Sequence, residues 1–118
     1  MIQGTGRVER DRAGLELFVE RRVAAPLGEV EAWLLGQGPD DAQVSAVELG
    51  NETVVYFSRR VASAAEAGDV GPELEFTLDR MVAALTGGVT PDRARYETLR
   101  PYYERLAMDG DPVSWPPS

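Results

Sequence analysis

The sequence predicts an α+β domain in which an antiparallel sheet of about four strands, made of two hairpins, packs against a long C-terminal helix. Two observations carry this prediction. Segments with alternating apolar residues occur in two pairs, and each pair flanks a short turn sequence. Residues 72–87 then carry an apolar stripe at helical spacing. Because 118 residues usually form one domain, we assign residues 1–108 to it and residues 109–118 to an extended tail.

The first hairpin is predicted over residues 4–10 and 15–23. Leu17 and Val19 fall on one face of its second strand, at the two-residue period of a strand buried on one side. Gly14 suits the turn between the strands, because glycine readily adopts positive φ.

A short helix and a second hairpin follow. Pro26 ends the strand and suits the first turn of a helix over residues 27–35, where its missing N–H costs nothing. The glycine-containing loop 36–41 ends this helix. Two β-rich runs, at residues 42–49 and 52–60, then flank a Gly-Asn turn. Both faces of this hairpin carry bulky residues, so we expect one face to meet a helix and the other to be open to a partner.

The carboxyl half is predicted to be mainly helical. Residues 61–70 are expected to hold only a short helical turn, and Pro72 is expected to open the longest helix. Gly87 ends that helix, because a glycine can adopt the left-handed conformation of a helix end. Its apolar stripe consists of Leu74, Leu78, Met81, Val82 and Leu85.

A final helical segment is predicted over residues 89–106. Thr90 is the expected cap residue, because Pro91 follows it at the first helical position. A break is expected near Arg100, because Pro101 disfavours helical geometry in the residue before it.

Composition excludes several chemistries. The net charge of −8, from 20 acidic and 12 basic residues, repels a phosphate backbone, so no nucleic-acid partner is expected. The chain has neither cysteine nor histidine, which removes disulfides, thiolate metal sites, cysteine nucleophiles and imidazole bases. We therefore predict no metal site and no cofactor, and we assign no catalytic residue. The pairs Arg21-Arg22 and Arg59-Arg60 are interpreted as solvated strand ends.

Nothing in the sequence points to a membrane or to export. No apolar run approaches the length that spans a bilayer, and the first residues lack the basic and apolar regions of a signal peptide. We therefore expect no membrane partner and a cytoplasmic location.

Two segments, in the correct order, resemble a known family. Residues 18–34, FVERRVAAPLGEVEAWL, read as a strand ending in arginine, an Ala-Pro, and a helix with Val and Trp near its middle. Residues 69–85, DVGPELEFTLDRMVAAL, read as a long helix that leads into an aromatic-rich segment. This pattern resembles the SRPBCC, or START-like, helix-grip domains, in the branch of homologues of the chaperone-ATPase activator. The resemblance implies a curved sheet and a long helix that enclose a ligand.

The chain departs from that family in its middle. Family members place several more strands and a second small helix where this chain has only the loop 36–41. The sequence therefore resembles a truncated helix-grip domain. Four strands do not curl far around a helix, so a deep cavity within one protomer is not expected.

The missing strands leave an uncovered sheet edge, which we place at residues 42–49. Uncovered edges pair with other chains unless they are blocked, and this one has no lysine or proline. A homodimer with twofold symmetry, paired along this edge or packed sheet to helix, is the predicted assembly. The alternative is a monomer whose edge is covered by the tail or by residues 89–106.

The candidate ligand-binding residues are large apolar side chains, each of which could equally belong to an ordinary core. They are Trp33, Tyr56, Phe57, Phe76, Met81 and Tyr96. Four strand carboxylates are candidate acid–base groups and are interpreted as solvated: Glu16, Glu20, Glu48 and Glu52. Asp79 and Arg80 are interpreted as a surface pair rather than a ligand clamp.

Three functions remain open at this point. The first is a non-catalytic SRPBCC-like protein that binds a small apolar ligand, or serves as a biosynthetic accessory, as a homodimer. The second is a protein-interaction module, in the manner of a chaperone co-factor, without a ligand. The third is a cyclase or hydrolase that works through carboxylates and tyrosines. It ranks last, because no carboxylate pair is convincingly spaced for acid–base work.

Overall fold

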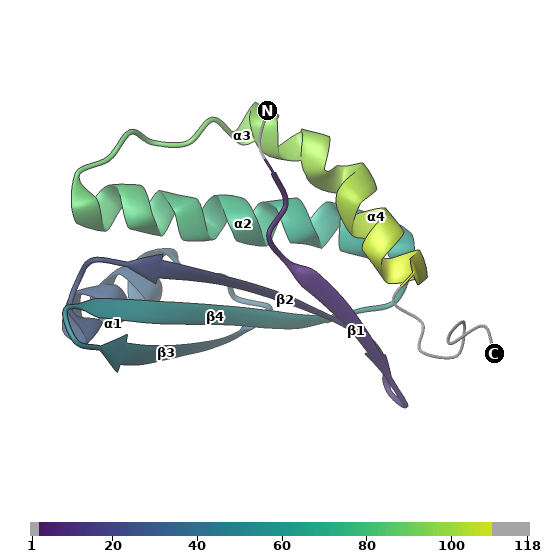
Figure 1. The fold of residues 1–118 in the computed structure, drawn as a ribbon, viewed down its shortest axis with the longest axis horizontal. Helices are drawn as coiled ribbons and strands as arrows, with labels where there is room; N and C mark the ends of the chain where they lie inside the picture. Colours follow the sequence, from purple (N-terminus) through teal and green to yellow (C-terminus); the bar gives the residue numbers. More distant parts are fainter. Residues whose placement is uncertain (1–2, 110–118) are drawn as a thin grey trace.

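The computed structural model describes residues 3–109 of the chain. The elements are β1 (Arg7–Asp11), β2 (Gly14–Val23), α1 (Leu27–Gln37), β3 (Gln43–Leu49), β4 (Glu52–Val61), α2 (Ala64–Thr86), α3 (Arg93–Tyr96), the 3-10 turn η1 (Glu97–Leu99) and α4 (Arg100–Asp109). α2 lies along one face of the sheet, and α4 packs beside it and against β1 (Figure 1). An open four-stranded antiparallel sheet with a long helix packed on it confirms the predicted α+β class.

The two hairpins join through their long strands. The strand order is β1-β2-β4-β3, and every pairing is antiparallel. In the central pairing Val19 lies opposite Phe57, and Glu20 lies opposite Tyr56. Val19 and Phe57 are buried on the inner face, toward α2, whereas Glu20 and Tyr56 are exposed on the outer face. The sheet therefore has a helix-covered face and an open one.

The core fills the layer between the inner face and α2. Leu17 and Phe57 from the sheet, and Leu78 and Met81 from the helix, are all 0% exposed. The layer between sheet and helix, where the family resemblance implied an enclosed ligand, is therefore occupied by core side chains. The predicted apolar stripe of the long helix is thus used for direct packing.

The longest helix starts earlier than the sequence analysis predicted. α2 is one helix of 23 residues, so the expectation of only a short turn before Pro72 is wrong. Its N-terminus is capped from both sides: the Ser63 hydroxyl accepts from the Glu66 N–H at 3.1 Å, and the Glu66 carboxylate accepts from the Ala62 N–H at 2.7 Å. Pro72 then sits inside the helix, where it is buried. Burial of this stretch outweighs the cost of the proline, about 3 kcal/mol.

The end of α2 and the following break agree with the sequence analysis, but the next cap does not. Gly87 ends α2 with a φ of 73°, as predicted. The cap of α3 is Asp92, whose carboxylate accepts from the Ala94 N–H at 3.1 Å, so the assignment of Thr90 is wrong. The helix breaks into the turn η1, and α4 restarts at Arg100, as predicted.

β3 is an edge strand without a covering segment among residues 3–109. It pairs with β4, whereas α4 packs on α2 and on β1 at the opposite edge. The predicted segment 89–106 therefore does not cover β3. Asp109 ends α4, and the rest of the predicted tail lies outside the described residues.

Candidate functional site

A network of polar side chains ties β2 to α2 and α4, and we call it the β2–α2 network. Its members are Thr5, Arg21, Glu75, Asp79, Tyr96 and Tyr103. The side chain of Arg21 is only 17% exposed, so its interpretation as a solvated strand end is wrong. A sequence signal for this was present, because Arg21 shares its strand face with Leu17 and Val19 and must point at the helix.

Glu75 is the buried centre of the network. It is 0% exposed, and Arg21 Nη2 donates to its Oε1 at 2.7 Å. The Thr5 N–H and hydroxyl donate to it at 3.1 and 2.9 Å, and the Tyr103 hydroxyl donates to its other oxygen. The carboxylate is thus saturated, which a buried charge requires. Sequence reasoning missed Glu75, although Glu75 and Asp79 stand four residues apart on one side of the helix.

Asp79 forms the outer half of the network. Arg21 Nε donates to its Oδ1 at 2.7 Å, and the Tyr96 hydroxyl donates to its Oδ2 at 2.6 Å. Its neighbour Arg80 instead bonds Gln37 of α1 at 2.9 Å, so the two do not form the expected surface pair. Asp79 therefore joins the sheet to the segment that follows α2.

The network raises the pKa values of its tyrosines and of its arginine, so these side chains keep their protons. Burial raises the pKa of Tyr96, and the bond to Asp79 raises it further. Burial likewise raises the pKa of Tyr103, together with the charge of Glu75. Burial alone lowers the pKa of Arg21, but the two carboxylates outweigh it and the net shift is upward. No buried side-chain polar atom in residues 3–109 lacks a partner. The arrangement therefore holds elements together and leaves no free base.

The six candidate ligand-binding residues do not share one space. Phe57 and Met81 lie in the core, each 0% exposed. Phe76 and Tyr96 form an edge-on pair, with ring centroids 5.3 Å apart. The remaining two lie elsewhere. Trp33 of α1 packs partly buried against the core, with Arg80 of α2 5.8 Å from its ring centroid, and Tyr56 stands on the outer face.

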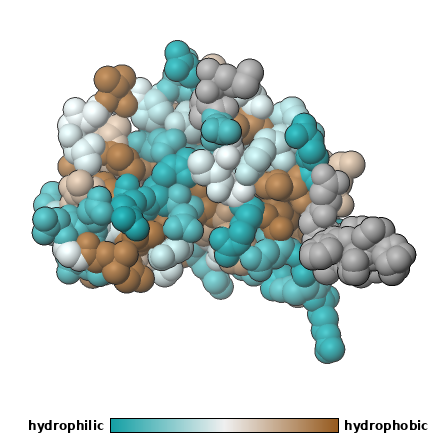
Figure 2. All heavy atoms as spheres, in the orientation of Figure 1, coloured by the Kyte–Doolittle hydropathy of each residue, from teal (hydrophilic) through white to brown (hydrophobic). Residues whose placement is uncertain are grey.

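An apolar depression lies between α1 and β3, and we call it the α1–β3 hollow. Its volume is about 450 Å³, and Leu34, Leu35 and Pro39 line it together with Val44 and Ala46 of the strand. Leu35 is 91% exposed and Val44 is 40% exposed. Apolar side chains also gather at the lower left of Figure 2, where Figure 1 places β3. The free strand edge is therefore flanked by exposed apolar surface.

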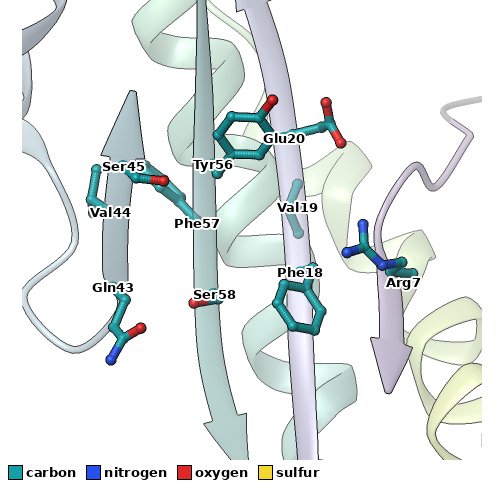
Figure 3. Close-up of a pocket in the computed structure, with 10 residues that line it drawn as sticks. All are labelled: Arg7, Phe18, Val19, Glu20, Gln43, Val44, Ser45, Tyr56, Phe57 and Ser58. Carbon is teal, nitrogen blue, oxygen red and sulfur yellow. The ribbon is translucent and has the colours of Figure 1, made fainter. Parts of the chain in front are cut away.

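A second depression lies on the opposite side of the sheet, and we call it the outer-face hollow. Its volume is about 370 Å³. Phe18, Glu20, Tyr56 and Ser58 stand around it on β2 and β4, and Arg7 of β1 points toward it (Figure 3). This hollow mixes aromatic rings with charged and hydroxyl groups.

Most strand charges are paired or bonded at the surface. Glu16 pairs with Arg60 at 3.6 Å, and Glu52 pairs with Arg22 at 3.4 Å. Glu48 accepts from the backbone N–H of Leu27 at 3.1 Å. The part of the chain that the structure describes contains no group of three acidic side chains placed to hold a metal ion. None of its helices is both long and apolar enough to cross a bilayer.

Comparison with known proteins gives a likeness in fold. No family model and no curated protein matches the sequence. The crystal structure of CalU16 from Micromonospora echinospora matches with a TM-score of 0.60 and 14% identity, over 89% of this chain and 97% of CalU16. At this identity the likeness concerns the fold, and it supports the helix-grip-like architecture.

Proposed function

We propose that this chain is a non-catalytic, helix-grip-like binding domain that works as a homodimer joined along β3, and that it holds a small apolar ligand beside that joint. One observation carries the proposal: the α1–β3 hollow adjoins an unpaired strand edge. A free edge presents unpaired N–H and C=O groups that a second strand can use. The fold likeness to CalU16 supports the frame and does not identify a ligand.

The sequence of β3 suits antiparallel pairing with itself. The strand has seven residues, and a twofold axis at Ala46 would pair all of them. Val44 would then lie opposite Glu48 of the second copy. The two Glu48 carboxylates, the only charges on the strand, would be offset by four residues, or about 13 Å at the usual rise per residue. Self-pairing therefore brings no like charges together.

Such a dimer would also enlarge the apolar hollow. With the axis perpendicular to the sheet, both α1 helices lie on the same face, on either side of the joined edges. Leu35 of each copy would then face the other across a floor made by Val44 and Ala46 of both strands. Two shallow hollows would become one trough with mostly apolar walls, in which Glu31 of each copy is the charged exception. A mostly apolar site with few polar groups is the kind that apolar ligands prefer.

The absence of cysteine makes the pairing directly testable. An Ala46→Cys variant places one thiol at the proposed axis, where paired Cβ atoms come within about 5 Å. We expect mild oxidation to yield a covalent dimer at low protein concentration. The matched control is Ala84→Cys, at an exposed position of α2 far along the chain from β3. Equal cross-linking of the two variants, or a monomeric mass at high concentration, would contradict the dimer.

The ligand is tested separately with an environment-sensitive apolar dye, 1-anilinonaphthalene-8-sulfonate. We expect its fluorescence to rise with the fraction of dimer, and Leu35→Gln to remove most of the rise while leaving the cross-link of Ala46→Cys intact. Val89→Gln is the control, because Val89 is 93% exposed outside the hollow. Dimer formation with no difference between these two variants would rule out the ligand and leave the dimer standing.

A second candidate is a protein-interaction module without a ligand. The filled core favours this candidate. The layer between the sheet and α2 is occupied by side chains, those of Leu17, Phe57, Leu78 and Met81, and not by a ligand. In this case β3 pairs with a strand of another protein, as in other cases of strand addition. A monomeric protein that binds no dye would favour this candidate over the first.

A further inference from the structure

We infer that the outer-face hollow is a second binding site, and that its ligand is a small organic ammonium ion. The hollow is built around Phe18, Glu20 and Tyr56 on the face of the sheet opposite to α2, and it meets the α1–β3 hollow only at Val44 and Ser45 of the edge strand. The inference therefore does not depend on the proposed dimer or on its apolar ligand.

Glu20 is the first observation. The other acidic side chains of the outer face are in ion pairs with arginines: Glu9 with Arg7, Asp11 and Glu16 with Arg60, and Glu52 with Arg22. Within residues 3–109, the exposed carboxylate of Glu20 takes part in no ion pair or hydrogen bond. Among the described residues, Glu20 is thus the carboxylate of this face that has no arginine partner, and it lies in the hollow.

Two aromatic rings accompany that charge. Tyr56 lies directly opposite Glu20 across the β2–β4 pairing, and it is 39% exposed. Phe18 stands two residues before Glu20 on the same face. The short side chains of Ser45 and Ser58 also line the hollow, beside these larger groups (Figure 3).

The molecule already places a cation on one of these rings. The guanidinium carbon of Arg7 lies 4.5 Å from the centroid of Phe18, which is the distance of a cation–π contact. No cation–π contact involves Tyr56 within the described residues. An ammonium ion at Tyr56 would use the face of its ring and the carboxylate of Glu20 together. Both groups favour a positive charge, and neither has another cation to satisfy it.

The volume of the outer-face hollow and the net charge of the protein also favour an organic ammonium ion. A volume of about 370 Å³ accommodates an ammonium ion that carries several carbon atoms. The net charge of −8 raises the local concentration of cations around the protein. An anion would meet the unpaired Glu20, whereas the guanidinium that lines the hollow, Arg7, is already paired with Glu9. A neutral ligand would leave the Glu20 carboxylate unpaired. Charge complementarity therefore selects a cation.

The test uses choline as the probe and follows backbone amide shifts of the full chain by NMR. We expect saturable shifts at Phe18, Glu20, Tyr56 and Ser58. The neutral control is 3,3-dimethyl-1-butanol, which has the shape of choline without its charge, and it should cause no saturable shift. Glu20→Gln and Tyr56→Leu should each weaken choline binding by about threefold or more.

Glu16→Gln is the matched protein control. It removes the same charge from the same strand and face, but Glu16 lies outside the hollow. We expect it to leave choline binding within about a factor of 1.5, as screening of a distant charge requires. If Glu16→Gln and Glu20→Gln weakened choline binding equally, the weakening would reflect the net charge of the protein and not a local contact. That result would overturn the inference. Equal shifts from choline and its neutral analogue, or none from either, would overturn it as well.

Discussion

Arg21 and Glu75 are joined by a bond of 2.7 Å between Nη2 and Oε1, although 54 positions separate them in the chain. The bond crosses from β2 to α2, and the same guanidinium also holds Asp79. Because Glu75 is 0% exposed, its charge is stable only while these donors remain in place. The long helix is therefore held on the sheet by a charged contact as well as by its apolar stripe.

Glu75→Gln should destabilise the fold strongly. The change removes the negative charge that Arg21 faces and replaces two good acceptor oxygens with one, inside a buried network. We expect a loss of about 3 kcal/mol in the free energy of unfolding, measured with urea. Glu73→Gln is the control, because Glu73 pairs with Arg93 at the surface of the same helix and should cost less than about 1 kcal/mol. A loss for Glu75→Gln as small as the loss for Glu73→Gln would show that the network adds no stability.

The buried tyrosines predict a loss of stability in alkali. The pKa values of Tyr96 and Tyr103 are raised in the folded protein, chiefly by burial. A raised folded pKa contributes stability below the unfolded pKa, which is about 10, and this contribution is lost as the pH rises further. We expect the urea midpoint to fall above about pH 10, and tyrosinate absorbance from these two residues to appear only on unfolding. Tyr96→Phe should reduce the slope of this fall, and an unchanged slope would contradict the assignment.

Gly71→Ala should loosen the contact between α2 and α4. A Cβ atom at Gly71 would lie 2.3 Å from Cγ of Tyr103, so the ring that reaches Glu75 would have to move. We expect a cost of about 1–3 kcal/mol in unfolding free energy. Gly36→Ala, in α1, meets no atom within 4 Å and should instead stabilise by about 0.5–1 kcal/mol. A gain in unfolding free energy from both changes would mean that the close approach of α2 and α4 at Gly71 is unimportant.

Val47→Lys should weaken self-association along β3. Val47 is 47% exposed on the edge strand, and a lysine there opposes pairing by placing two like charges near the joint. We expect the mass in solution, measured by light scattering at several concentrations, to fall toward that of a monomer. Val89→Lys changes the same residue type at a 93% exposed loop position and should leave the mass unchanged. A lower mass for Val89→Lys alone would count against the β3 interface.

Local patterns were sufficient where neighbouring residues decide the conformation. The alternation around Leu17, the Gly-Asn turn and the glycine at position 87 predicted the hairpins and the end of the long helix, because each signal acts within a few residues. The start of α2 is also encoded locally, in the reciprocal cap of Ser63 and Glu66, whereas the position of Pro72 does not mark it.

The candidate site depended on contacts that no local pattern specifies. The sequence by itself determined an acidic, helix-grip-like α+β chain without cysteine or histidine, and a β3 edge that lacks lysine and proline. Only the tertiary structure decided that Arg21 meets Glu75, that Phe57 and Met81 fill the core, and that Glu20 stands unpaired beside Tyr56. The reason is physical: burial and pairing depend on distances between elements, which are set when the sheet and helices pack together.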